Sequence, residues 1–587
     1  MRGSLRRATP VAWALVLAVL LLGGALGPGY ALSYDMVWVP DLAISRDVLG
    51  LGTAQPRALP SDAVVAALDE VVGGSLLQKL VLLGMLVGAG CGFAALVGER
   101  SLGARLVAVT VGMWNPYVAE RLLLGHWPLL IGYAVLPWLV VALRGGGDPA
   151  RLPRRVLPLL VLGSLSASAG LMTALVALSV AGRRPRRHTV LLLAGLLGAN
   201  APWVVAGMST PASSSSDPVG AVVFATADEG LMSGPVAALS FGGVWNADVV
   251  PGSRLGIAGL VLTFILVSAA AAGIVRVRRG THVPHLGALA VCWTVGWGSA
   301  VLSWAAPEAL GWLGEHFPGG GLVRDGSRLL GLAVPLVVVL VAVAVDGVLE
   351  RLPDSASRVV VAGVLALVPL TLMPDAIWGM QGRLVAVDYP DAYVDARRAV
   401  ARAPAGDALS LPFESYRTPA WNGDRRVLDP LGRYLGRDTV VNDVLIVSGR
   451  SVAGEDPRAA VVRRALEAGG ARERSAALRA AGISVVVAES IVGYPDVDLV
   501  GEQVVDGDLS VTVLGPAAAP SAPTGRTAAM ALAWAAWLAV LLATLAALVR
   551  GRRGPVEARG GATGVIADDG EPVDDAAGIV TQRPTDW

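Results

Sequence analysis

The sequence has few charged residues, and this shortage excludes whole classes of protein. Only 16% of its 587 residues are charged, whereas a soluble globular chain carries roughly 25%. The net charge is +1, so no general excess of basic residues favours binding to nucleic acid. With a mean hydropathy of +0.61 as well, the chain is not a series of soluble domains.

Cysteine, lysine and histidine are also scarce. The two cysteines, Cys91 and Cys292, lie in apolar runs, which excludes a disulfide framework and a cysteine-rich metal site. Lys79 is the only lysine among 47 basic residues, and the five histidines are scattered along the chain. No G-x-G-x-x-G, Walker A loop, zinc-ligand spacing or serine-centred nucleophile elbow occurs in the sequence. The common nucleotide-binding, zinc-binding and hydrolase motifs are therefore absent.

Apolar residues make up 54% of the chain, and they gather in runs long enough to cross a membrane. A spanning helix needs about 20 mostly apolar residues, and arginines mark its cytoplasmic flank. The pattern predicts a polytopic α-helical protein of the plasma membrane with about 12 membrane-embedded helices and both termini in the cytoplasm. The runs are 11–27, 76–97, 106–117, 127–143, 156–182, 189–207, 255–275, 286–304, 328–345, 359–373 and 527–549. The first run also resembles a cleaved signal peptide, but an uncleaved anchor is favoured.

The run 156–182 is interpreted as two short helices that form a hairpin. A single span would place the arginines of 183–187 outside, against the positive-inside bias. The centre of the run, 163–170, is small and polar, and such backbone is tolerated at membrane depth where protein or a cavity buries it. The second half of the sequence shows no matching interruption.

Long polar segments fall on the outer side of this topology. Residues 1–375 are expected to form a multi-span domain with outer loops at 28–75, 208–253 and 305–327. Residues 376–524 are expected to form an extracytoplasmic α/β domain, followed by a final transmembrane helix at 525–550 and a disordered cytoplasmic tail at 551–587. Within the α/β domain, helices are predicted at 390–403, 456–468 and 472–481, and strands at 408–413, 440–447, 483–488, 499–505 and 509–514.

Carboxylates in the first outer loop are candidates for chemistry. Asp35 lies a few residues beyond the first span, and Asp41 and Asp47 follow it. A carboxylate at the membrane surface could act as a general base on a hydroxyl group or bind a divalent ion that holds a phosphate. The alternative is that these aspartates cap helices in a solvated loop.

A second candidate segment, 114–128, lies at the outer ends of two spans. It contains Glu120, Arg121 and His126 among proline and aromatic residues. Ionisable residues at membrane depth are functional hypotheses by default. The alternative is an aromatic belt in which Glu120 and Arg121 pair with each other.

A third candidate is the glycine-rich outer loop 316–328. It contains Arg324, Asp325 and Arg328 directly before a span. Arginine suits a phosphate because its guanidinium donates two parallel hydrogen bonds, and a glycine run lets backbone N–H groups approach an anion. The alternative is a glycine-rich turn with an Arg–Asp pair that anchors the helix to the lipid headgroups.

The outer loop 208–253 is rich in polar residues. Its composition suits sugar binding through carboxylates and a tryptophan, but it suits a mobile polar loop equally. The polar and aromatic residues concerned are Ser213–Ser216, Asp217, Asp228, Glu229, Trp245 and Asp248.

Taken together, these features resemble the polytopic C-type glycosyltransferase superfamily, in particular the arabinofuranosyltransferase-like membrane proteins of actinobacteria. The run 35–40 (DMVWVP) is similar to the opening of the first outer loop in that family. The segments NPYV at 115–118 with GHW at 125–127, LVRDGSR at 322–328 and LRAAGISVVV at 478–487 look like recurrent segments of such chains. The resemblance covers most of residues 1–550.

The resemblance implies transfer of a sugar from a polyprenyl-phosphate donor to a cell-envelope glycan or glycolipid in a lipid membrane, without nucleic acid. It implies Asp35 as the base with Asp41 as its rival, and Arg324 and Arg328 as ligands of the donor phosphate. A divalent cation, Mg²⁺ or Mn²⁺, is a candidate cofactor, although Asp35 lacks the adjacent acidic residue of the usual metal-binding pair. The residues expected to support the site are Glu120, Arg121, His126 and Asp325.

Two other functions remain open from the sequence. The chain could be a transporter or flippase for a lipid-linked envelope precursor, which often shows repeated halves with interrupted helices. It could also be a non-catalytic scaffold for envelope assembly, whose outer domain binds enzymes or polysaccharide.

Overall fold

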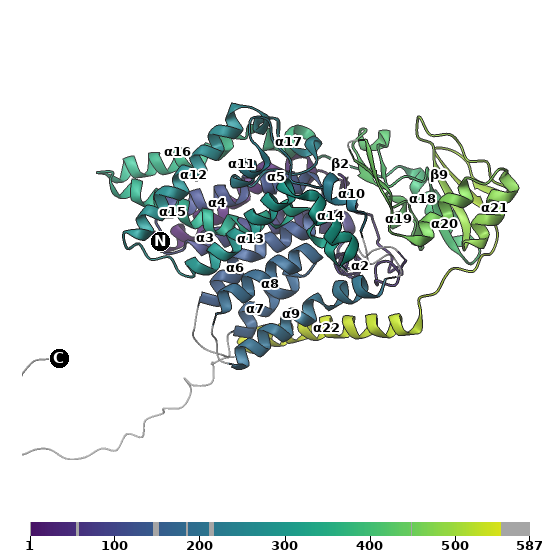
Figure 1. Ribbon diagram of the computed structural model, residues 1–587, viewed down its shortest axis with the longest axis horizontal. Coiled ribbons are helices and arrows are strands. Elements are labelled where there is room, and N and C mark those ends of the chain that lie inside the picture. The colour runs from purple at the N-terminus through teal and green to yellow at the C-terminus, as the bar shows by residue number, and fades with distance from the viewer. Residues whose placement is uncertain are drawn as a thin grey trace, which may run out of the picture.

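The computed structural model describes residues 2–53, 58–144, 152–182, 186–210, 216–317, 319–447 and 449–552. It contains a large helical region and, to one side of it, a smaller unit of strands and helices (Figure 1). Several sequence predictions fall outside the described residues: the disordered tail from 553 onward, Arg183 and Arg184 of the arginine cluster, and Ser213–Ser215.

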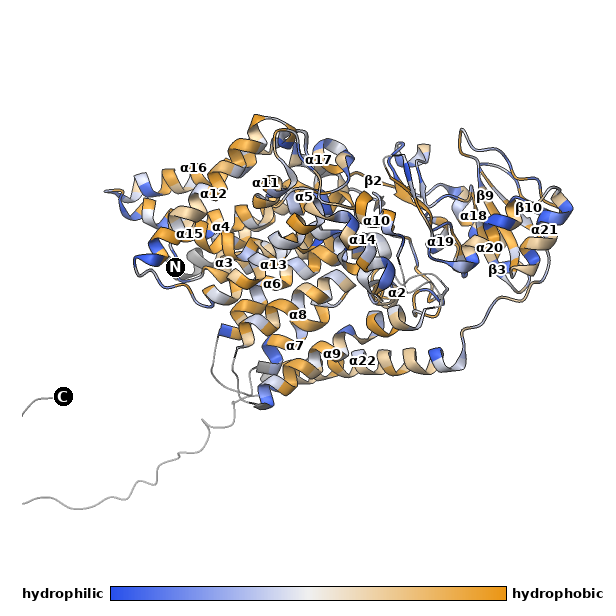
Figure 2. Cartoon of the chain, viewed as in Figure 1, coloured by the Kyte–Doolittle hydropathy of each residue, from blue (hydrophilic) through white to orange (hydrophobic). Residues whose placement is uncertain are grey.

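Helices occupy every segment that the sequence assigns to the membrane. In the described part of the chain, eight helices are long and apolar enough to cross a membrane, which makes this a multi-pass membrane protein. They are α1 (Arg2–Leu22), α3 (Gly74–Leu96), α6 (Trp127–Arg144), α9 (Arg186–Ser209), α12 (Ile257–Arg278), α13 (Leu286–Ala305), α16 (Ser355–Leu372) and α22 (Thr524–Arg552). Figure 2 shows mostly apolar residues along α12, α16 and α22.

The remaining helices of the membrane region are shorter or bent. A helical turn η5 (Gly326–Leu332) meets α15 (Val334–Glu350) at an angle of 42°, and together they are long enough for one span. The helices α4 (Leu102–Met113), α7 (Leu152–Gly163) and α8 (Ala167–Ala181) have 12, 12 and 15 residues. Because these three are too short to pass as full spans, the total of about 12 membrane-embedded helices stays a prediction.

The run 156–182 forms two helices, as predicted. The side chain of Ser166 caps α8 by accepting a hydrogen bond from the amide of Ala169. Gly163, at the end of α7, lies against Thr173, whose hydroxyl donates to the Gly163 carbonyl at 3.1 Å. A Cβ atom on Gly163 would lie 2.2 Å from that hydroxyl oxygen, so the break needs a residue without a side chain. The bend between η5 and α15 is a second interruption, in the half where the sequence showed none.

The C-terminal region that the sequence predicts as a domain, and that keeps the name C-terminal domain, contains a five-stranded mixed sheet in the order β10-β11-β9-β3-β6. Strand β3 is parallel to both of its neighbours, and β11 is antiparallel to both of its neighbours. Val485 and Val487 of β9 belong to the core with α18, whereas Val486 packs with α20 and α21. The strands are β3 (Asp407–Leu411), β6 (Thr439–Val440), β9 (Ile483–Glu489), β10 (Glu502–Val505) and β11 (Leu509–Val513), and the helices are α18 (Asp391–Arg402), α20 (Pro457–Leu466) and α21 (Ala471–Ala480).

The strand predicted at 440–447 is wrong in its extent. It is divided between β6 and β7 (Leu445–Val447), and β7 pairs with β8 (Arg450–Val452) in a separate ribbon. The cause lies between the two strands, where Asn442 donates to the carbonyl of Phe413 and accepts from the amide of Val444. Asparagine side chains that bond to nearby backbone in this way compete with strand pairing.

The loop 28–75, named the first outer loop after the side of the membrane that the sequence predicts for it, is bound to the C-terminal domain at several described positions. Strand β1 (Tyr30–Ala31) pairs antiparallel with β2 (Ala386–Val387), so the start of the loop forms a small sheet with the start of the domain. Further along the described part of the loop, ion pairs join the same two parts of the chain, and Arg46 also pairs with Asp407. The other pairs are Asp41–Arg397, Arg46–Asp438 and Asp62–Arg433.

The final helix, α22, also contacts the first outer loop. In Figure 1, α22 lies beside α9 along one edge of the helical region. Near its start, Arg526 donates to the carbonyl of Gly50 at 2.8 Å, and Trp534 donates to the carbonyl of Leu49 at 3.1 Å. The first outer loop therefore lies between the C-terminal domain and the helix that follows this domain.

Candidate active site

The backbone around Asp35 is held from two sides. The amide of Asp35 donates to the carbonyl of Leu124, at the end of the short helix α5 (Pro116–Leu123). The preceding residue, Tyr34, has a φ of 45°, an uncommon value for a residue with a side chain. Its amide and carbonyl make hydrogen bonds of 2.8 Å with Arg426 and Leu428 of the C-terminal domain. These bonds fix the conformation that directs the Asp35 side chain.

Each oxygen of the Asp35 carboxylate has a neighbour. The hydroxyl of Tyr416 donates a hydrogen bond to Oδ1, and Nε2 of His126 lies 3.2 Å from Oδ2. The Asp35 side chain is nevertheless 42% exposed, so a substrate hydroxyl can reach it. This combination of fixed orientation and exposure suits a carboxylate that accepts a proton.

His126 connects Asp35 to a buried arginine. Its Nδ1 lies 3.4 Å from Nη1 of Arg121. Arginine has only donors, so Nδ1 accepts, and in the neutral ring Nε2 carries the hydrogen and donates to Asp35. Burial lowers the pKa of His126, although the Asp35 carboxylate acts in the opposite direction, and this favours the neutral ring.

Gly125 allows the histidine to come this close to the first outer loop. It has a φ of +80°, and a Cβ atom there would lie 2.1 Å from the amide nitrogen of Met36. A side chain at this position would therefore separate α5 and α6 from the loop that carries Asp35.

Arg121 forms a buried, two-pronged ion pair with Asp325. Its two terminal nitrogens lie 3.1 and 3.3 Å from the two carboxylate oxygens, and Ser327 accepts a further bond from Nη2. Nε of Arg328 donates to the same carboxylate at 3.0 Å. Burial alone would raise the pKa of Asp325, but Arg121 and Arg328 outweigh it and hold the pKa well below its ordinary value.

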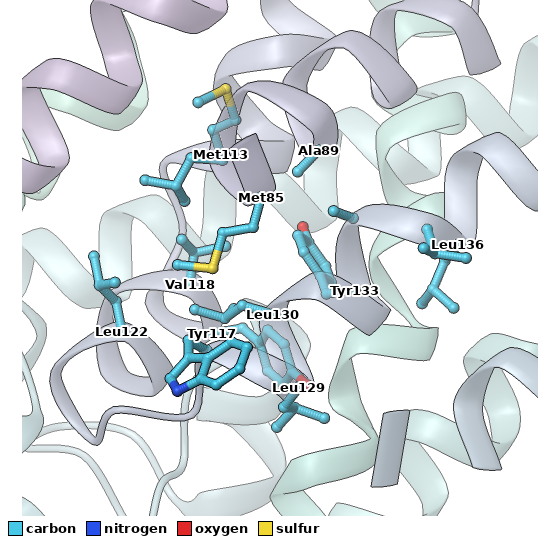
Figure 3. Packing of buried hydrophobic residues seen from close by; sticks show 14 of the residues in the cluster. Met85, Ala89, Met113, Tyr117, Val118, Leu122, Leu129, Leu130, Tyr133 and Leu136 are labelled. Atoms are coloured by element: carbon cyan, nitrogen blue, oxygen red, sulfur yellow. The ribbon is translucent and has the colours of Figure 1, made fainter. Parts of the chain in front are cut away.

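The helix that carries Arg121 is fixed by its cap and its packing. Asn115 accepts a hydrogen bond from the amide of Val118, and Pro116 occupies the first helical position, where its missing N–H is harmless. In Figure 3, Tyr117, Val118 and Leu122 lie beside residues of α6 in the buried core. The hydroxyl of Tyr117 also donates to the carbonyl of Arg328, which ties α5 directly to the glycine-rich loop 316–328, the arginine loop.

Five of the eight residues predicted for the site are thus connected in one chain of contacts. This series of contacts begins at Tyr416 and ends at Arg328, whose side chain is 35% exposed. It joins three segments that are distant in sequence and the C-terminal domain. Its members, in order, are Tyr416, Asp35, His126, Arg121, Asp325 and Arg328.

The other three predicted residues have different partners. Asp41 is exposed and forms its ion pair with Arg397 of α18. Arg324 lies over the ring of Phe224, with its Cζ atom 4.9 Å from the ring centre. Its Nη1 is 3.7 Å from Glu455.

Glu120 faces away from its neighbour Arg121. It is buried against Glu229, which forms its own ion pair with Arg254 at 2.7 Å. Burial, followed by the Glu229 carboxylate, raises the pKa of Glu120 well above its ordinary value, which favours its neutral form. The alternative in which Glu120 and Arg121 pair with each other is therefore wrong, because each makes its closest contacts on a different side of α5.

The loop 208–253 contributes to the surroundings of the site. Asp248 Oδ2 lies 3.4 Å from the hydroxyl of Tyr34, the residue before Asp35. Trp245 packs edge-on against Phe224, the ring beneath Arg324. Glu229 of this loop pairs with Arg254, which directly follows the loop, and both side chains are fully buried, away from any sugar at the surface.

Sequence reasoning missed Tyr416 and Ser327. Tyr416 lies 381 positions after Asp35, and no motif surrounds it. Ser327 lies between Asp325 and Arg328, which were both predicted. Its small polar side chain beside these charged residues was the signal that could have identified it. A metal site was left open, but in the described ranges no group of three His, Cys, Asp or Glu residues could hold a metal ion. No step is therefore assigned to a divalent cation.

Comparison with known proteins bears on the fold. No protein-family model and no curated protein sequence matches the chain. The cryo-EM structure of the arabinofuranosyltransferase AftD from mycobacteria aligns over 87% of this chain and 40% of its own length, with 18% identity and a TM-score of 0.53. A mutant of the same enzyme aligns over 87% and 41%, with 16% identity and the same TM-score.

An oligosaccharyltransferase from Archaeoglobus fulgidus aligns over 82% of this chain and 68% of its own length, but its TM-score of 0.36 and identity of 12% are too low to support an argument. The chain spans about two fifths of the length of AftD. At such low identity the likeness is one of fold, and it confirms the family resemblance seen in the sequence: over the aligned part, this chain has the fold of a mycobacterial membrane arabinofuranosyltransferase.

Proposed function

We propose that the chain is a membrane glycosyltransferase that moves a sugar from a polyprenyl-phosphate donor to a cell-envelope glycan or lipid acceptor on the outer face of the plasma membrane. The observation that carries this proposal is the chain of contacts from Asp35 to Arg328. It connects an oriented, partly exposed carboxylate with a partly exposed guanidinium group. The arabinofuranosyltransferase fold gives independent support.

In the proposed reaction, Asp35 and Arg328, at the two ends of this series of contacts, have different tasks. The oxygen of an acceptor hydroxyl attacks the anomeric carbon of the donor sugar, and Asp35 takes the hydroxyl proton. The bond between the anomeric carbon and the phosphate oxygen breaks, and its electron pair stays on the phosphate. Arg328, with Arg324 as a second cation, stabilises the charge that develops there.

The buried residues between the two ends hold them in place. His126 donates to one oxygen of Asp35, and Asp325 accepts from Nε of Arg328. Arg121 contacts both His126 and Asp325 from within the protein. Positioning of this kind lowers the barrier because the reacting groups need not reorganise during the reaction.

The test is transfer by the purified full chain in lipid nanodiscs, supplied with a labelled polyprenyl-phosphate sugar and an envelope glycan acceptor. We expect Asp35→Asn to lower kcat by at least about 100-fold, since it removes the general base. Asp395→Asn, in an exposed surface ion pair, is the matched control and should retain activity. Full activity in Asp35→Asn contradicts the proposal, and loss only in Asp41→Asn assigns the base to the rival carboxylate.

One observation favours a second candidate function, the transport of a lipid-linked precursor. The chain has interruptions in both halves, at 164–166 between α7 and α8 and at the bend between η5 and α15. Paired interruptions are common in transporters. Movement of a fluorescent polyprenyl-phosphate sugar across proteoliposomes, without transfer to an acceptor, is the outcome that would favour this function.

A further inference from the structure

Tyr416 contacts the Asp35 carboxylate from outside both the membrane region and the first outer loop. The guanidinium of Arg433, in the same domain as Tyr416, also interacts with this carboxylate electrostatically. Tyr416 lies on β4 (Tyr416–Arg417), which pairs antiparallel with β5 (Val427–Leu428) in the C-terminal domain. Strand β5 in turn bonds to Tyr34, because the amide of Leu428 donates to its carbonyl at 2.8 Å. The same two-stranded ribbon therefore holds both the backbone before Asp35 and the side chain of Asp35.

The ribbon is itself fixed to the central sheet. Arg417, next to Tyr416, is buried and forms ion pairs with Glu489 at 3.0 Å and with Asp429 at 3.1 Å. Its Nη2 also donates to the hydroxyl of Ser410 on β3 at 2.6 Å. Because Glu489 lies on β9, the central sheet determines where the Tyr416 hydroxyl lies.

The ring of Tyr416 is also restrained. It packs edge-on against the ring of Tyr34 with 6.3 Å between the ring centres. An edge-to-face contact of this kind favours one orientation of the ring. The hydroxyl is thus presented to Asp35 by groups that are already in place before a substrate arrives.

We propose that Tyr416 is a positioning residue for Asp35, and that the C-terminal domain thereby completes the active site. This inference rests on the proposed function of Asp35 as a base. A hydrogen bond donated to a carboxylate favours the ionised form, which is the form that can accept a proton. With Tyr416 on Oδ1 and His126 on Oδ2, the carboxylate is also prevented from rotating away from the acceptor.

The first experiment measures the pH dependence of sugar transfer by the full chain with Tyr416→Phe, which retains the ring and removes the hydroxyl. We expect kcat to fall by about 10- to 100-fold, in keeping with the loss of a hydrogen bond to a charged group. The acidic limb of the pH profile should move to higher pH, and KM for the donor should be unchanged. An acidic limb at the wild-type position overturns the proposal.

Tyr389→Phe is the matched control. The Tyr389 hydroxyl donates to the carbonyl of Trp38 at 2.9 Å, so it joins the same domain to the same loop without contact to Asp35. If Tyr416 merely strengthened the contact between loop and domain, the two variants would lose activity equally. We expect Tyr389→Phe to keep the wild-type pH profile, and an equal loss in both variants overturns the proposal.

A second measurement separates this inference from the proposed function. A water-soluble carbodiimide reacts with protonated carboxyl groups, and the extent of modification of the exposed Asp35 can be followed by mass spectrometry against pH. We expect the midpoint of this reaction to lie at higher pH in Tyr416→Phe than in the wild type. An unchanged midpoint overturns the role of Tyr416, whereas a shifted midpoint in a chain without transfer activity supports it and contradicts only the proposed function.

Discussion

His126 joins two charged residues through the two nitrogens of its ring. On one side it approaches Arg121, which can only donate, and on the other side it approaches the Asp35 carboxylate. The neutral ring with its hydrogen on Nε2 satisfies both neighbours. Protonation would place a second donor against the guanidinium of Arg121. Burial also lowers the pKa of the ring, so both effects disfavour the protonated form.

The stability of the protein should therefore depend on the protonation of His126. A histidine whose pKa is lowered on folding contributes fully above its ordinary pKa of 6.5, and this contribution is lost as the pH falls from there through the folded value. We expect the unfolding temperature of the wild type to drop more steeply than that of His126→Gln between about pH 7 and about pH 5. Parallel curves for the two proteins would contradict the buried neutral ring.

At the scale of elements, α5 directs two sequence neighbours to different parts of the molecule. Successive residues of a helix lie about 100° apart around its axis. Glu120 accordingly reaches Glu229, whereas Arg121 reaches Asp325. The sequence predicted that this segment and the arginine loop carry the site, because both combine ionisable residues with outer ends of spans. The sequence could not predict whether Glu120 or Arg121 would face the loop 316–328, because tertiary packing alone decides which side chain points there.

The link between α5 and η5 should also be measurable as stability. Removing one partner of a buried ion pair leaves an uncompensated charge, so Asp325→Asn should destabilise the protein by about 3–5 kcal/mol. The exposed Asp395–Arg398 pair gives the comparison, and Asp395→Asn should cost less than about 1 kcal/mol. Unfolding of both variants in the same lipid mixture measures the difference. Equal stabilities would show that Asp325 is not the anchor of this pair.

At the scale of the whole molecule, the positions of the helices and the mixed α/β nature of the C-terminal domain could be predicted from runs of apolar residues and their flanking arginines. The attachment of the first outer loop to that domain could not. It depends on pairs such as β1 with β2 and Arg46 with Asp438, which join positions more than 350 residues apart. Such pairs leave no periodic signal in one sequence, and for the same reason Tyr416 was missed.

The orientation of the molecule in the membrane can be tested with single cysteines. Val492 in the C-terminal domain and Arg279 at the end of α12 are both exposed, and the predicted topology places them on opposite sides. In intact cells, a membrane-impermeant maleimide should label Val492→Cys but label Arg279→Cys only after permeabilisation. The unchanged chain, whose Cys91 and Cys292 lie within helices, gives the background. The reverse pattern of labelling would overturn the topology.

The contact between Asp35 and Tyr416 also sets an order of events during synthesis. A ribosome adds about 5–20 residues per second, so the 381 positions between the two residues correspond to roughly 20–80 seconds. Over that interval the early helices can enter the membrane while the carboxylate still lacks its partner. A chain whose translation stops before the C-terminal domain would therefore remain in the membrane without Tyr416, and under the proposed function it would lack transfer activity.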